Sequence, residues 1–96
     1  MSRQLLRALW QLLADADVRL VSERPWHSLI FSGTQIELSA VVSAENHAEM
    51  AAQFERMLSN HDFHLNGVLV ADIAVTERVA VANETRLIIH ALLLED

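Results

Sequence analysis

Two groups of residues in this sequence have side chains that could do chemistry, and the first is a histidine pair. His61, Asp62 and His64 place two imidazoles and a carboxylate within four residues, so they could approach one divalent metal ion. A protein metal site needs three or four ligands, and the other three histidines of the chain stand in separate segments. We therefore expect exposed loop histidines and no metal or other cofactor, with His61 and His64 as the only metal candidates.

The second group is Asp72, Arg86 and His90, which lie in the two longest apolar, β-branched runs of the chain, 67–75 and 86–94. An Asp–His pair can orient a general base, so these three residues are the catalytic candidates. The simpler interpretation is a buried carboxylate whose charge is paired by Arg86, by His90 or by a partner chain. Cys, Lys and Tyr are absent, and the nearest hydroxyls on the predicted strands, Ser28 and Ser39, belong to no recognisable motif, so we do not expect an enzyme.

Residue types also exclude several function classes. All seven basic residues are Arg, which removes Schiff-base chemistry and a phosphate-loop lysine. The net charge is −6 and the arginines are scattered, so we expect no nucleic-acid partner. The two glycines are far apart and form no phosphate-binding loop. The lack of Cys rules out disulfides and fits a cytoplasmic protein.

Composition indicates one folded domain, residues 1–96. With 52% hydrophobic and 21% charged residues, the chain is too apolar for disorder. No apolar run approaches the roughly 18 residues of a membrane span, so we expect a soluble protein with no membrane partner. The apolar start is interrupted by Gln11 and Asp15, and no small-residue cleavage site follows it. We therefore expect no signal peptide.

Alternation within the two apolar runs divides their side chains between two strand faces. We predict that the runs are paired central strands with one wholly apolar face and one face that is apolar but carries Asp72, Arg86 and His90. The wholly apolar face would hold Leu69, Ala71, Ile73, Val75, Leu87, Ile89, Ala91 and Leu93. The mixed face would hold Val68, Val70, Asp72, Ala74, Arg86, Ile88, His90, Leu92 and Leu94.

The remaining segments supply helices and outer strands. A helix capped by Ser2 is predicted from an i, i+3, i+4 stripe of leucines, and a second helix is predicted to start near Asn46 or Ser43. Residues 26–42 are predicted as a hairpin that turns at 32–34, with Gly33 supplying a positive φ, and 23–25 as a turn around Pro25. Two points stay open: whether 18–21 joins the sheet, and whether 76–85 is a loop or a hairpin extension.

These elements predict an α+β fold, with a mainly antiparallel sheet of four or five strands and two amphipathic helices on one face. The order is helix, two or three strands, helix, two strands. This order resembles that of the small tail-terminator proteins of long-tailed phages, which also return through a second helix to final strands. The resemblance covers most of the chain, includes no shared motif, and implies a ring-forming structural protein without assigning any residue a role.

Two helices cover one face of such a sheet, and the chain has no third layer for the other face. An apolar patch left on a sheet face usually marks an interface, so we expect a homo-oligomer, most simply a dimer, and leave open a further protein partner. The leading function is a non-enzymatic self-associating interaction or assembly module. The alternatives are a small metal- or Asp/His-dependent enzyme or ligand-binding protein, and a tail-terminator-like structural protein. The expected oligomer interface is Val68, Val70, Asp72, Arg86, Ile88, His90, Leu92 and Leu94.

Overall fold

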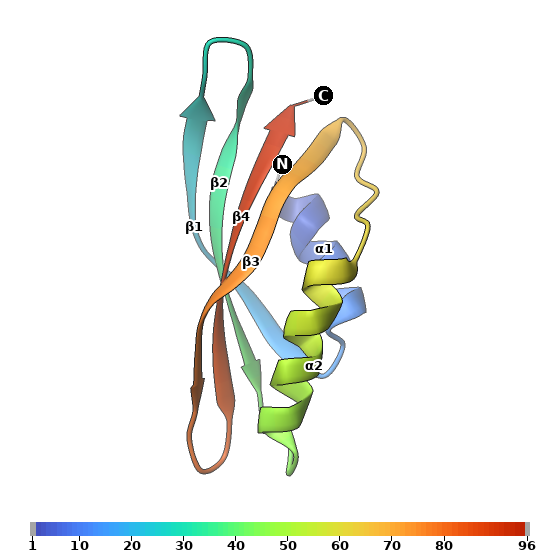
Figure 1. Cartoon of the computed structure of the whole chain (residues 1–96), viewed down its shortest axis with the longest axis vertical. Helices are drawn as coiled ribbons and strands as arrows, with labels where there is room; N and C mark the ends of the chain where they lie inside the picture. Colours follow the sequence, from blue (N-terminus) through green and yellow to red (C-terminus); the bar gives the residue numbers. More distant parts are fainter. Residues whose placement is uncertain (1, 96) are drawn as a thin grey trace.

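The computed structural model describes residues 2–95 and confirms the predicted α+β class, with two helices and one four-stranded antiparallel sheet (Figure 1). The order of elements is helix, two strands, helix, two strands. No helix in this part of the chain is long and apolar enough to cross a membrane. The elements are α1 (Ser2–Leu12), β1 (Ala16–His27), β2 (Ser32–Val42), α2 (His47–Asn60), β3 (Val68–Ala80) and β4 (Thr85–Glu95).

The strands follow the order β1-β2-β4-β3, and every neighbouring pair is antiparallel. The centre of the sheet is therefore β2 and β4, and the prediction that the run containing β3 is a central strand is wrong. An edge position suits β3 because its ladder with β4 is interrupted by bulges at Ala71 and Thr76, and bulges are common on edge strands.

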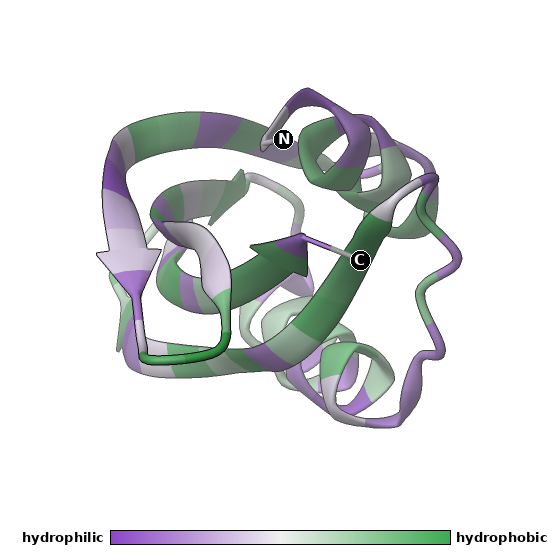
Figure 2. Ribbon diagram, turned by 90° about the horizontal axis from the view of Figure 1, so that it is seen from above, coloured by the Kyte–Doolittle hydropathy of each residue, from purple (hydrophilic) through white to green (hydrophobic). Residues whose placement is uncertain are grey.

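Both helices pack on one side of the twisted sheet, which we call the covered face (Figure 1). Leu5 and Leu9 of α1 and Phe54 of α2 are buried against strand side chains such as Leu38 and Ile89. Figure 2 looks along the long axis and shows both helices beside the sheet, with β4 coloured as hydrophobic over most of its length. The molecule is elongated, with extents of 46 × 21 × 19 Å, because the long strands run along its main axis.

Strand β1 settles one open point and corrects one prediction. Residues 18–21 belong to β1, and Pro25 lies within the same strand, paired with Thr34, where a turn was predicted. Proline is tolerated there because β1 is an edge strand and needs no amide donor on its outer side. The true hairpin turn lies at 28–31, where Ser28 N donates to the Phe31 carbonyl at 2.9 Å and Phe31 N donates to Ser28 Oγ at 3.0 Å.

Gly33 has a different role from the one predicted. It lies inside β2 and is buried, and its φ is not positive. A β-carbon added at this position would overlap the carbonyl oxygen of Leu93 on β4 and press on the Leu94 side chain. Glycine is therefore required for the close approach of two backbones. Within residues 2–95 the only glycine with positive φ is Gly67, at 68°.

The β3–β4 connection is a hairpin extension, which settles the second open point. Strand β3 continues to Ala80, and the turn is closed by Val81 N donating to the Glu84 carbonyl at 2.9 Å. The start of α2 is tied to this hairpin, since Nδ1 of His47 lies 2.7 Å from Oγ1 of the fully buried Thr85.

Candidate functional site: the open face of the sheet

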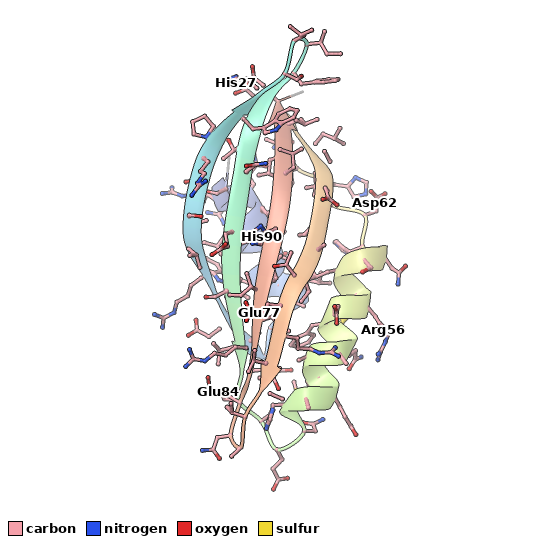
Figure 3. The ribbon with its side chains drawn as sticks, turned by 60° about the vertical axis from the view of Figure 1, so that its left-hand side comes forward. His27, Arg56, Asp62, Glu77, Glu84 and His90 are labelled. Atoms are coloured by element: carbon pink, nitrogen blue, oxygen red, sulfur yellow. The ribbon has the colours of Figure 1, made fainter. Side chains whose placement is uncertain are left out.

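The face of the sheet opposite the helices, which we call the open face, consists of five rows of side chains that run across the strands in the order β1, β2, β4, β3. Residues that are directly opposed in an antiparallel ladder share one face, so the strand register defines each row. Figure 3 views this side of the molecule, with His90 near its middle. The rows are Trp26, Gly33, Leu94, Leu69; Arg24, Gln35, Leu92, Asp72; Ser22, Glu37, His90, Ala74; Arg19, Ser39, Ile88, Glu77; and Asp17, Val41, Arg86, Val79.

The bulge at Ala71 corrects the predicted faces of β3. One extra residue reverses the alternation, so Leu69 lies on the open face, whereas Val68 and Val70 pack against the core under the helices. The prediction that Val68 and Val70 lie on the mixed face is therefore wrong. The prediction for β4, which has no bulge, is confirmed: Arg86, Ile88, His90, Leu92 and Leu94 share the open face.

The open face carries apolar side chains along its centre and at one end. Val41, Ile88 and Leu92 are half-buried, although both helices lie on the other side of the sheet. The end row, formed by Trp26, Gly33, Leu94 and Leu69, has no polar side chain apart from the indole N–H, and Leu69 is 58% exposed. A face of this kind can bury further apolar surface against another molecule.

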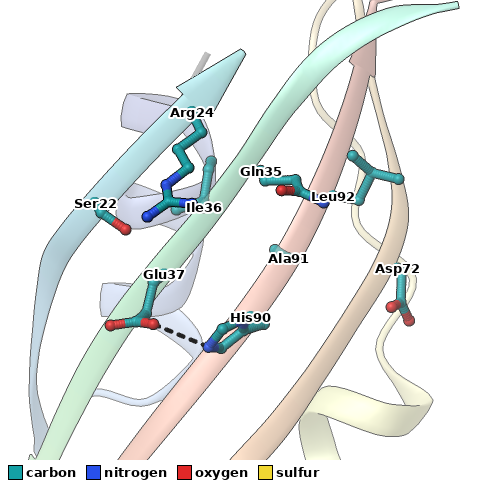
Figure 4. A pocket seen from close by; sticks show the side chains of 9 residues that line it. All are labelled: Ser22, Arg24, Gln35, Ile36, Glu37, Asp72, His90, Ala91 and Leu92. Atoms are coloured by element: carbon teal, nitrogen blue, oxygen red, sulfur yellow. Dashed lines mark ion pairs between the residues drawn. The ribbon is translucent and has the colours of Figure 1, made fainter. Parts of the chain in front are cut away.

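A trough of about 410 Å³ crosses the open face (Figure 4). Arg24 of β1 and Asp72 of β3 stand at opposite sides of the trough, and Leu92 lies between them. Glu37 and His90 form its floor, with Nε2 of His90 3.0 Å from Oε1 of Glu37. The trough thus combines an apolar centre with charged groups at its ends.

The three catalytic candidates do not assemble into a site. His90 pairs with Glu37, and Arg86 donates from Nε to Glu84 at 2.6 Å. Asp72 lies opposite Leu92, diagonal to His90, and its side chain is exposed. The expectation that Asp72 is a buried charge paired with Arg86 or His90 is therefore wrong, because the strand that carries it is at the edge of the sheet.

The histidine pair at 61–64 lies away from the open face, in the segment between α2 and β3. Nε2 of His64 is 3.5 Å from Oδ2 of Asp62, and both side chains are at least 85% exposed. The His61 ring instead packs edge-on against Phe63, with 4.5 Å between ring centroids. Within residues 2–95 no three His, Asp or Glu side chains are grouped so that they could hold a metal ion.

In two rows of the open face the charges are divided between the two edges, whereas the last row carries Asp17 on β1 and Arg86 on β4. Arg19 and Arg24 lie on β1, and Asp72 and Glu77 lie on β3. Arg19 also contacts Asp17 on its own strand at 3.0 Å, and the hydrogen bond and charge of Asp17 raise the pKa of Arg19. Sequence reasoning did not single out Arg24, Glu37 or Glu77 as site residues. Alternation does place Glu37 on the outward side of β2, but only the strand order shows that Glu37 meets His90.

Comparison of the chain with protein-family models, with curated proteins and with solved structures finds no match. The likeness to phage tail terminators in element order therefore stays a prediction.

Proposed function

We propose that this protein is a non-enzymatic interaction or assembly module that associates with itself through the open face. The observation that carries the proposal is that both helices lie on the covered face, while Val41, Ile88 and Leu92 on the other side have no layer above them in residues 2–95. An apolar patch on a protein surface, rimmed by polar residues, often marks a site of interaction with another protein. We include a cytoplasmic location in the proposal, supported by the absence of Cys.

The size of the open face is suitable for a stable contact. A face four strands wide, with strands of 11 to 13 residues, measures roughly 19 Å by 37 Å, or about 700 Å². A standard protein interface buries about 800 Å² on each partner. A second copy of the same face would cover this area with little left exposed, so a twofold dimer is the simplest assembly.

The polar groups on the open face are compatible with burial in such a contact. The side chains of Glu37 and His90 are already paired with each other, with Nε2 of His90 3.0 Å from Oε1 of Glu37, and both lie in the central row. Arg24 and Asp72 lie at the edges, where the rim of an interface is normally polar.

A ring like that of the tail terminators would need a second, different surface, because a contact between two identical faces closes at a dimer. The tip of the β1–β2 hairpin is a candidate for that surface. Leu29 and Ile30 project there with almost fully exposed side chains, and Phe31 is 47% exposed.

A second candidate function, small-ligand binding, is favoured by the trough. Its volume of about 410 Å³ lies in the range of about 300 to 1,000 Å³ for small-molecule sites. Arg24 at one side and Asp72 at the other would suit a small molecule that carries a carboxylate at one end and an amine at the other. A thermal-shift screen of ω-amino acids of increasing chain length against wild type and Arg24→Ala would test this function. Stabilisation of wild type alone would support it, and no shift with any amino acid would count against it.

Ile88→Arg tests self-association. Ile88 lies near the middle of the open face, so an arginine there would place an unpaired charge inside a contact between two open faces, and the variant should be monomeric with wild-type circular dichroism. Val81→Arg is the matched control, because Val81 is 54% exposed in the β3–β4 turn and outside the open face. If Ile88→Arg keeps the mass of the wild-type oligomer, the open face is not the contact.

A further inference from the structure

The open face has an electrical polarity across its strands. Arg24 shares a row with Asp72, and Arg19 shares a row with Glu77, with the arginine on the β1 edge and the carboxylate on the β3 edge in each case. Three strand spacings separate the two edges, about 14 Å, which is too far for an ion pair within one chain. Within residues 2–95 the side chains of Arg24, Asp72 and Glu77 take part in no hydrogen bond or ion pair.

Two copies can stack open face on open face with full overlap about two twofold axes, both in the plane midway between the two sheets. If the axis is perpendicular to the strands, β1 lies over β1 of the second copy and the order of rows is reversed. If the axis is parallel to the strands, β1 lies over β3 of the second copy and each row lies over itself. Because the charges are divided between the edges, the two arrangements differ in electrostatic energy.

The perpendicular axis brings like charges together. It places Arg24 over Arg19 of the second copy and Asp72 over Glu77 of the second copy, and the twofold symmetry repeats each contact. It also places the apolar end row over the row that contains Asp17 and Arg86. Like charges facing each other in an interface are strongly unfavourable.

The parallel axis brings opposite charges together. Arg24 then lies over Asp72 of the second copy, and Arg19 lies over Glu77 of the second copy. In the centre, β2 lies over β4, so Glu37 faces His90 of the second copy. The apolar end row lies over itself, which places Trp26 against Leu69 of the second copy.

We infer that two copies pack open face to open face about a twofold axis parallel to the strands, so that the β1 edge of each copy meets the β3 edge of the other. This inference rests on the proposed self-association. It adds the direction of the twofold axis and the residues that meet across the contact. The contact is isologous, because the same four edge charges are used by both copies. Its sandwich geometry matches aligned packing of two sheets, whose strands cross at about −30° because each sheet is twisted.

Charge reversal at one edge tests this arrangement. Arg24→Asp places the introduced carboxylate over Asp72 of the second copy in both contacts, and Asp72→Arg places the introduced guanidinium over Arg24 of the second copy in both. Each variant alone should raise the dimer dissociation constant at least about tenfold, about 1.4 kcal/mol, measured by sedimentation equilibrium at low salt. Arg56→Asp and Glu45→Arg are matched controls, because both residues lie on or beside α2, away from the open face.

Mixing the two variants gives the decisive result. In a heterodimer of Arg24→Asp with Asp72→Arg, one edge contact joins the two introduced side chains and the other joins the two native ones, so both again pair opposite charges. The equimolar mixture should therefore associate within about threefold of wild type. The double variant Arg24→Asp/Asp72→Arg should recover in the same way, and only through contacts between chains, because the two positions lie about 14 Å apart in one chain.

The outcomes separate this inference from the proposed function. A dimeric wild type whose two variants associate normally, or whose mixture stays as weak as each variant alone, would overturn the parallel axis and leave self-association standing. A wild type that is monomeric at every concentration would overturn both. Circular dichroism of each variant checks that the fold is kept, which the exposure of Arg24 and Asp72 leads us to expect.

Discussion

At the residue scale, Asp72 shows that the place of a carboxylate in the sheet decides whether its charge needs an ion pair. Its place in an apolar run predicted a buried carboxylate with a partner. In the structure Asp72 is exposed on an edge strand, opposite Leu92, and the bulge at Ala71 precedes it. An exposed carboxylate remains hydrated, so its charge needs no ion pair within the chain.

We therefore expect Asp72→Ala to change the free energy of unfolding by less than about 0.5 kcal/mol. The measurement is urea unfolding in the Ile88→Arg background, because association would otherwise add to the apparent stability. A loss of about 3 kcal/mol or more, as for a broken buried ion pair, would show that Asp72 is buried.

Gly33, in contrast to the exposed Asp72, lies where the sheet has no room for a side chain. A methyl group there would overlap the Leu93 carbonyl oxygen, so β2 and β4 would have to move apart. Gly33→Ala should cost about 1 to 3 kcal/mol in urea unfolding, the usual range for overpacking. Ser32→Ala, at the neighbouring exposed position, is the control and should stay within about 0.5 kcal/mol of wild type. Equal stability of both variants would contradict the close approach.

At the element scale, the sequence predicted those elements whose periodicity is regular. Both helices and the two faces of β2 and β4 follow the expected spacing, because no bulge interrupts them. The faces predicted for 72–75 of β3 were correct, but those for 68–70 were wrong, because the bulge at Ala71 lies within an apolar run and leaves no local signal. The hairpin turn was misplaced because Gly33 and Pro25 are strong turn signals, whereas the actual turn at 28–31 is mostly apolar.

The contact between α2 and the β3–β4 hairpin was also invisible in the sequence, since His47 and Thr85 are 38 residues apart. His47→Ala would leave the buried Thr85 hydroxyl without its partner, which should cost about 1 to 3 kcal/mol in urea unfolding. Thr85→Val removes that hydroxyl, so adding His47→Ala to Thr85→Val should cost clearly less than His47→Ala alone. Strictly additive losses would mean that the two side chains do not interact.

At the scale of the whole molecule, the sequence predicted that one sheet face lacks a covering layer, but not how charge is arranged on it. The contribution of β4 to that face was correct, from Arg86 to Leu94. Arg24 and Asp72 lie at opposite ends of one row because the strand order is β1-β2-β4-β3. This order is set by the long-range pairing of β2 with β4 and not by any local sequence pattern.

The most direct test of self-association is the mass of the wild-type protein in solution. Light scattering after gel filtration at micromolar concentration should give at least twice the chain mass of 10.8 kDa, and Leu92→Arg should lower it to one chain or aggregate. A wild type of 10.8 kDa at every concentration, together with a folded and unchanged Leu92→Arg variant, would contradict the proposal that the open face is where this protein binds itself.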